Sequence, residues 1–218
     1  MCIRDRLNRD KLRAVLEKWK GHPSITDLFD RFDKLQNYTK KKLEKEPKFN
    51  LVELEHIDVA EDPVRPELSM EFRKSYGRKV FGLKDEQGEL AAIMCFAFTN
   101  QVPKSVEEMD MLSKDAAMQA VHRAGVQGNI AIAYTVWAKK KGGGKHMVNE
   151  VYKMVKQSNH INRLVTLSPL TEMAERFHIK NGAKKLQVNE TTQNFEYDIT
   201  LEDWEKALDK AKRFLKIK

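Results

Sequence analysis

The side chain with the clearest chemical potential in this sequence is His178, which lies within a stretch that runs from Asn129 to Asn189. Imidazole titrates near neutral pH, so a histidine is well suited to positioning an anion and delivering a proton. Thr135, within the apolar run before the glycine-rich turn, carries a hydroxyl that can donate or accept a hydrogen bond. Taken alone, each residue also fits a structural role, either as a helix histidine satisfied by a neighbour or as an ordinary strand threonine.

A glycine-rich basic turn, KKKGGGK, lies between these two residues in the chain. Glycines let backbone amides approach a phosphate closely, a helix N-terminus adds a positive dipole end, and lysines supply charge. The turn therefore predicts a pyrophosphate site, and a flexible basic loop is the alternative. The residues predicted to bind the phosphates are Lys139, Lys141, Gly142, Gly143, Gly144 and Lys145.

The elements around these residues follow from hydrophobic periodicity. The apolar run Ile130 to Ala138 predicts a buried strand, and a helix is predicted to open just after the glycines. Arg163 to Leu167 reads as a second strand, and Thr171 to Asn181 as a second helix that Gly182 stops. The unit is therefore strand, glycine turn, helix, strand, helix.

Earlier segments predict antiparallel strands. An edge strand is expected within FNLVELEHIDV, and a hairpin joins Lys79–Lys84 to Leu90–Phe98. Ser105 caps a short helix through SVEEMDML, and a second helix is expected across AAMQAVHRA. FEYDI supplies a last strand. The predicted class is α/β with a mixed sheet, in which antiparallel strands come first and a strand-helix-strand crossover comes late.

The two ends of the chain predict helices. Residues 1–47 are predicted to form a helical N-terminal appendage, and residues 48–218 the catalytic domain, which ends in an amphipathic helix capped by Thr200. Residues 1–6 match the translation of a common sequencing-adapter end, and whether they are an artefact is left open.

Composition narrows the classes of partner. No apolar run approaches a membrane span and no signal peptide is apparent, so a soluble cytoplasmic protein without membrane partners is expected. The net charge of +8 favours an anionic partner. An aromatic content of 8% without aromatic-basic interleaving weighs against nucleic acid, whereas a phosphorylated small molecule fits. Cys95 is expected to be a buried thiol, and no His/Cys/Asp spacing predicts a metal site.

Four segments in order resemble one family. The element order is similar to that of the GNAT acetyltransferase superfamily, but His178 stands where those enzymes often carry a tyrosine. FHIKNGA, with VN shortly after it, resembles a stretch of malonyl-CoA decarboxylase, whose catalytic domain is a GNAT fold. RLVTLSP resembles its FVTLSP, FTNQVPKSV resembles another of its segments, and Tyr134-Thr135 falls where it carries a Tyr-Ser pair. The likeness spans roughly Tyr76 to Tyr197.

Three features depart from that family. Lysine replaces the first residue of the GNAT glycine signature, only residues 1–47 could represent the family's large helical domain, and the long insertion between TLSP and FHL is missing. These departures leave the acyl group open.

The resemblance implies a GNAT-like acyl-CoA-binding fold and a decarboxylase that converts a malonyl-type thioester of coenzyme A to acetyl-CoA and CO2. It implies that His178 and Thr135 are catalytic, and that Tyr134, Ser168 and Asn181 bind substrate. Coenzyme A would enter only as part of the substrate, malonyl-CoA or acetyl-CoA, with no metal or organic cofactor.

Two other functions remain open. One is a GNAT N-acetyltransferase that uses acetyl-CoA, for which Glu53, Glu55 or a water chain would supply the base. The other is a non-catalytic protein that binds acyl-CoA or nucleic acid through its basic face. The sequence also leaves open whether the chain forms a homo-oligomer.

Overall fold

A computed structural model describes residues 48–122 and 127–200 of the chain. The helices predicted for residues 1–47 and for the C-terminal end lie outside these residues, so the proposed domain boundary stays a prediction. No helix among the described residues combines the length and the apolar character that a membrane crossing requires.

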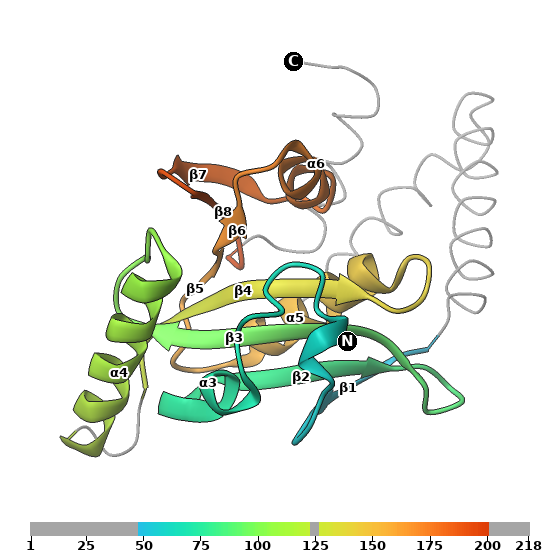
Figure 1. Cartoon of the computed structure of the whole chain (residues 1–218), viewed down its shortest axis with the longest axis horizontal. Helices are drawn as coiled ribbons and strands as arrows, with labels where there is room; N and C mark the ends of the chain where they lie inside the picture. Colours follow the sequence, from blue (N-terminus) through green and yellow to red (C-terminus); the bar gives the residue numbers. More distant parts are fainter. Residues whose placement is uncertain (1–47, 123–126, 201–218) are drawn as a thin grey trace, which may run out of the picture. The chain divides into compact units, whose positions relative to one another are not determined.

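One mixed sheet forms the centre of the described residues (Figure 1). Its spatial order is β1-β2-β3-β4-β5-β8-β6, and β7 pairs with the other side of β8. The strands β1 to β4 are antiparallel to their neighbours, whereas β4 and β5 run parallel and need a crossover, which the helix α5 provides. The predicted α/β arrangement is therefore confirmed. The strands are β1 Asn50–Glu53, β2 Lys79–Lys84, β3 Leu90–Thr99, β4 Ile130–Ala138, β5 Arg163–Thr166, β6 Ser168–Pro169, β7 Lys184–Val188 and β8 Thr192–Tyr197.

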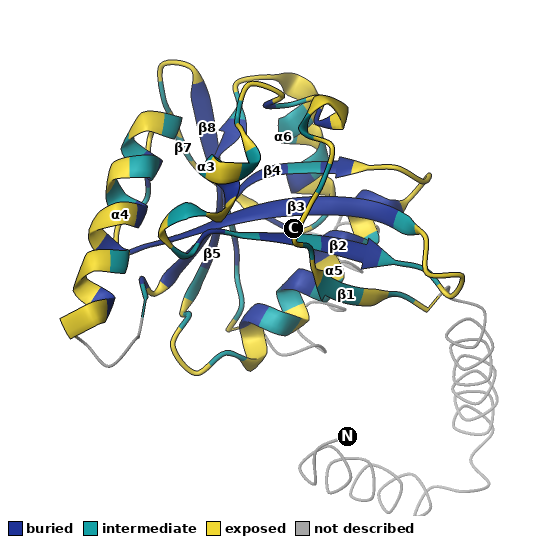
Figure 2. Cartoon of the chain, turned by 60° about the horizontal axis from the view of Figure 1, so that its bottom comes forward, coloured by how far each residue is buried: buried dark blue, intermediate teal, exposed yellow. Residues whose placement is uncertain are grey.

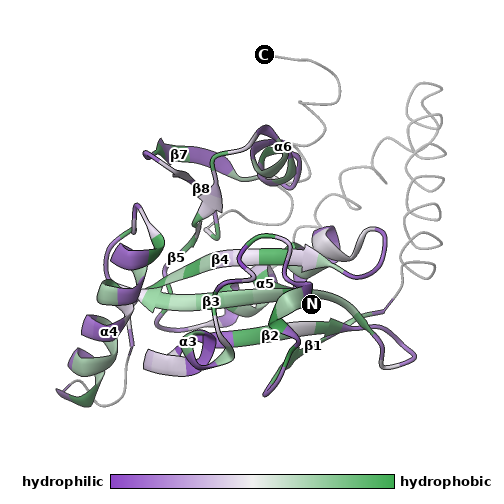
Figure 3. Ribbon diagram, in the orientation of Figure 1, coloured by the Kyte–Doolittle hydropathy of each residue, from purple (hydrophilic) through white to green (hydrophobic). Residues whose placement is uncertain are grey.

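Helices cover both faces of the sheet, which is why β3 and β4 are buried along nearly their whole length (Figure 2). The apolar side of α5 packs on one face through Met147, Val148, Val151 and Val155. Residues of α3 and α4 pack on the other face, and the apolar colouring of β3 and β4 in Figure 3 matches this double burial. The helices are η1 Val59–Glu61, α3 Met70–Lys74, η2 Ser75–Gly77, α4 Val106–His122, α5 Gly143–Gln157 and α6 Glu172–Lys180.

Some boundaries differ from the predictions. The two helices expected between Ser105 and residue 124 form one continuous helix, α4. The strand β7 was not predicted, because four of its five residues are exposed and it shows no buried face. The last strand starts at Thr192, three residues before FEYDI, because polar residues of β8 are buried there.

The strand β4 carries an irregularity at the centre of the sheet. Cys95 of β3 pairs with Thr135, and the next residue, Phe96, pairs with Ala133, so Tyr134 is an extra residue in β4. Such a bulge bends the strand and redirects the side chains that follow. Pairing between β4 and β5 ends at Ala133 and Thr166. The bulge and the end of strand pairing together separate β4 from β5 beyond this point. We call this place the fork.

The glycine turn is anchored to β3 by one carbonyl group. The Ala91 oxygen accepts hydrogen bonds from the backbone amides of Lys139, at 2.9 Å, and Lys140, at 3.0 Å. Gly143 lies against the same group, and a Cβ atom at this position would come within 2.2 Å of that oxygen. The helix α5 begins at Gly143, with Gly142 at φ 83° as its N-cap, and not after the third glycine as predicted.

Gly143→Ala should therefore destabilise the fold, because the new methyl group would meet backbone and not a side chain that can move. The expected loss in free energy of unfolding is about 1–3 kcal/mol, the usual cost of overpacking. Urea denaturation checks this, with the exposed Lys141→Ala as the control that leaves stability within about 0.5 kcal/mol. A Gly143→Ala protein as stable as the control would contradict the close packing.

Candidate functional site

A cavity of about 290 Å³ lies at the fork between β4 and β5. Side chains from β4, β5, α5 and α6 line it. Five predicted site residues are among the lining residues, namely Tyr134, Thr135, Gly144, Ser168 and His178. None of the described residues that line it carries a formal charge at neutral pH. Much of its wall is apolar and includes Met94, Val148, Val151, Leu164, Met173 and Phe177.

His178 sits in the cavity wall with both ring nitrogens occupied. Its Nε2 lies 2.9 Å from the Ser168 hydroxyl, and its Nδ1 lies 2.9 Å from the Tyr197 hydroxyl. The ring stacks on Phe195 with centroids 5.0 Å apart and is only 5% exposed. His178 lies on the helix α6, which positions it in the cavity wall. The N-terminus of this helix is capped by the Thr171 side chain, which accepts a hydrogen bond from the Ala174 amide.

Burial lowers the pKa of His178 to about 4, so the ring is neutral at physiological pH. The expectation that this imidazole titrates near neutral pH is therefore wrong in this environment. A neutral imidazole has one N–H donor and one acceptor nitrogen, and a hydroxyl can complement either. His178 can thus relay a proton between Tyr197 and Ser168 without first becoming charged.

Tyr197, His178 and Ser168 form a chain of hydrogen-bonded groups, which we call the relay. The relay extends to one more hydroxyl, that of Thr166. Ser168 Oγ donates to Thr166 Oγ1 at 3.1 Å, and Thr166 Oγ1 also accepts from the Phe195 backbone amide. Burial raises the pKa of the Tyr197 hydroxyl, which keeps that end of the relay protonated. Sequence reasoning missed Tyr197, because it lies 19 residues from His178 and no motif marks it.

Thr135 is hydrogen-bonded to a residue that the sequence did not single out. Its Oγ1 lies 3.0 Å and 3.1 Å from the two carboxylate oxygens of Asp62. A carboxylate only accepts, so the Thr135 hydroxyl must donate to it. The proton of Thr135 is then available to a ligand only if the hydroxyl turns away from Asp62.

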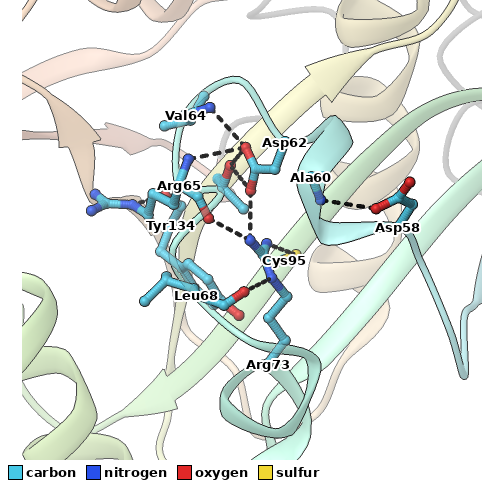
Figure 4. A network of polar contacts seen from close by, with 10 residues as sticks. Asp58, Ala60, Asp62, Val64, Arg65, Leu68, Arg73, Cys95 and Tyr134 are labelled. Atoms are coloured by element: carbon cyan, nitrogen blue, oxygen red, sulfur yellow. Dashed lines mark hydrogen bonds and ion pairs between the residues drawn. The ribbon is translucent and has the colours of Figure 1, made fainter.

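Asp62 is the centre of a buried polar network (Figure 4). It accepts from the backbone amides of Val64 and Arg65 and forms an ion pair with Arg73 at 2.9 Å, both side chains being 0% exposed. Arg73 also donates to the carbonyls of Leu68 and Arg65. The network fixes the loop that follows η1 against β4.

Cys95 closes this network on the side of β3. Its thiol is fully buried, as predicted, and accepts from Arg73 Nη1 at 3.2 Å. Burial raises the pKa of the thiol to about 11, so Cys95 stays protonated and belongs to the core.

The lysines of the glycine turn differ in their partners. Lys139 forms an ion pair with Glu61 at 2.6 Å, and Lys140 pairs with Asp85 and Glu89. Lys141 and Lys145 are exposed and make no ion pair with any described residue. Gly144 lines the cavity, where a Cβ atom would lie 3.2 Å from the Phe177 ring. The turn therefore adjoins the cavity at the N-terminus of α5.

Two other predicted site residues have structural contacts. Asn181 caps the end of α6, its side-chain nitrogen donating to the Phe177 carbonyl at 2.8 Å, and it does not line the cavity. Tyr134 borders the cavity, but its ring packs edge-on against Phe72 at 6.4 Å. The structure thus brings together five predicted site residues and leaves Asn181 outside the group. The five are Tyr134, Thr135, Gly144, Ser168 and His178.

The positive charge of the chain does not come from the described residues. Basic and acidic side chains are equal in number over the described residues, so the net +8 arises from residues 1–47, Arg123 and residues 201–218. Any anion held at the site must therefore be recognised by local contacts and not by the net charge of the described residues. Among the described residues, no group of three or more His, Cys, Asp or Glu side chains is placed to hold a metal ion.

The lowered pKa of His178 predicts a pH dependence of stability. Above about pH 6.5 the ring is neutral in both the folded and the unfolded chain. As the pH falls from 6.5 towards 4, only the unfolded chain takes up the proton, so the protein loses up to about 3 kcal/mol.

Urea denaturation at pH 7 and at pH 4 measures this loss, and the same pair of measurements on His178→Gln removes the contribution of other groups. The wild-type protein should lose more stability than the variant between the two pH values. Equal losses would contradict a buried neutral histidine.

Two solved structures share this fold. The chain aligns with malonyl-CoA decarboxylase from Cupriavidus metallidurans at 12% identity and a TM-score of 0.50, over 71% of this chain and 61% of that one. It aligns with malonyl-CoA decarboxylase from Agrobacterium vitis at 13% identity and a TM-score of 0.52, over 72% of this chain and 62% of that one. No family model and no curated protein sequence matches the chain.

The predicted GNAT-like fold, in the form found in malonyl-CoA decarboxylases, is therefore confirmed. The chain spans less than two thirds of each of those proteins. At these identities the likeness shows the fold alone.

Proposed function

We propose that this protein is a decarboxylase that converts a malonyl-type thioester of coenzyme A to acetyl-CoA and CO2. The observation that carries the proposal is His178, a neutral histidine with a hydroxyl on each ring nitrogen, in the wall of an uncharged cavity. The likeness of the fold to two solved structures named malonyl-CoA decarboxylase supports the same choice.

The uncharged cavity suits the bond-breaking step. A carboxylate that leaves water for an apolar site loses its solvation, and loss of CO2 spreads its charge over the larger thioester enolate. The electron pair of the broken C–C bond moves to the α-carbon and into the thioester carbonyl. Since the thioester is the electron sink, the reaction calls for no organic cofactor. Backbone amides after Tyr134 would hydrogen-bond the enolate oxygen.

The hydroxyl and imidazole relay suits the second step. The α-carbon of the enolate needs one proton, which the Ser168 hydroxyl or the His178 N–H would deliver. The neighbouring members of the relay then shift their protons, and a proton from solvent restores the starting state. Thr135 would contact the acyl carboxylate or carbonyl once its hydroxyl leaves Asp62.

Acyl transfer to an amine fits this site less well. It needs a base that takes up a proton near neutral pH, and burial lowers the pKa of His178 to about 4. The alternative bases Glu53 and Glu55 pair with Lys79 and Lys74, and neither lines the cavity. Decarboxylation requires no such base.

His178→Ala should abolish decarboxylation and leave the affinity for coenzyme A within a few fold, because the coenzyme would bind mainly at the glycine turn. Mass spectrometry of malonyl-CoA incubated with protein measures the reaction, and equilibrium binding measures the affinity. The matched control is His160→Ala, an exposed histidine outside the cavity, which should retain full activity.

Either of two results would contradict the proposal. Malonyl-CoA left unchanged by the wild-type protein would turn attention to acyl transfer, which a screen of amines with acetyl-CoA would test. Loss of activity and of coenzyme affinity in the same proportion in His178→Ala would remove the catalytic role of the histidine.

A further inference from the structure

Arg65 places a buried cation directly behind the cavity wall. The residue is only 7% exposed, and its guanidinium makes two hydrogen bonds to backbone carbonyls. Nε donates to the Tyr134 oxygen at 2.9 Å, and Nη2 donates to the Leu167 oxygen at 2.9 Å. The inference drawn from this residue rests on the proposed function.

These two carbonyls belong to the two strands of the fork. Tyr134 directly follows the last paired residue of β4, and Leu167 directly follows the last residue of β5. The guanidinium therefore crosses the gap where the strands have stopped bonding to each other. Val64, Tyr134 and Ser168, which adjoin its contacts, line the cavity, while Arg65 itself does not.

None of the described residues neutralises the charge of Arg65 through an ion pair. Asp62 is nearby, but its carboxylate pairs with Arg73 and meets only the backbone amide of Arg65. No carboxylate of the described residues lies within ion-pair distance of the Arg65 guanidinium, although Glu67, Asp62 and Glu107 act on it from further away. Burial lowers the pKa of Arg65, yet an arginine stays protonated at neutral pH.

A buried cation without a counter-ion is costly unless something compensates for it. The two carbonyl oxygens accept from two of its five N–H donors and do not neutralise its positive charge. None of the described residues that line the cavity is charged, so Arg65 provides a fixed positive charge next to a binding space that these residues leave uncharged. An anion in that space would be attracted across the thin wall, since the interior screens charges weakly.

We propose that Arg65 determines the substrate class of the site, by favouring thioesters whose acyl group is anionic over those whose acyl group is neutral. A malonyl-type acyl group carries one negative charge when it binds, and the enolate carries it after CO2 has left. The charge disappears only when the α-carbon is protonated. The attraction therefore lasts through the reaction and ends with the neutral product, which favours product release.

The test compares two ligands that differ by one carboxylate, malonyl-CoA and acetyl-CoA. Their dissociation constants are measured on protein that carries His178→Ala, so that malonyl-CoA is not consumed. Arg65→Gln keeps side-chain donors but removes the charge, and it should reduce the preference for malonyl-CoA by about tenfold, the scale expected for unit charges several ångströms apart at intermediate dielectric. Arg65→Lys keeps the charge and should retain most of the preference, even if both affinities fall.

Arg176→Gln is the matched control, because it removes one positive charge from an exposed position on α6 and should leave the preference unchanged. A merely structural Arg65 would lower both affinities equally, and an unchanged ratio in Arg65→Gln would overturn the proposal. If Arg65→Gln does not fold, loss of the preference in a folded Arg65→Lys would overturn it as well.

The two proposals fail in different ways. Protein that binds neither thioester would contradict the proposed function. Protein that binds both thioesters with equal affinity would contradict only the role of Arg65.

Discussion

The strands β4 and β5 stop pairing after Ala133 and Thr166, and the polar backbone released at this point must find other partners. The Leu167 amide still reaches the Ala133 oxygen, and the guanidinium of Arg65 takes up the carbonyls of Tyr134 and Leu167. The cavity exists because the Arg65 side chain, and not a neighbouring strand, donates hydrogen bonds to the carbonyl groups at the fork. The site therefore depends on the loop that carries Arg65.

That loop is held by charges that are themselves buried. Asp62 and Arg73 form an ion pair without exposure to solvent, and removing one partner of such a pair typically costs about 3–5 kcal/mol. The same carboxylate holds the hydroxyl of Thr135 in the cavity. Asp62 thus contributes both to the stability of the loop and to the geometry of the site. A change at Asp62 would therefore alter the loop, the fork and the orientation of Thr135 together.

Local patterns in the sequence predicted the parts of the fold that local patterns determine. The apolar run of β4 predicted its limits, and the glycine after Asn181 predicted the end of α6. The partners of the site residues could not be predicted this way, because Asp62 lies 73 residues from Thr135 and only the folded chain brings them together. The protonation state of His178 does not follow from local sequence either, since its pKa depends on burial by residues from other elements.

The most direct test of the central claim uses malonyl-CoA labelled with ¹³C in its free carboxyl group, followed by NMR in the presence of the wild-type protein. The account predicts that the label appears as carbon dioxide and bicarbonate while unlabelled acetyl-CoA accumulates in equal amount, at a rate that depends on protein concentration. Label that stays in the malonyl group at high protein concentration would contradict it.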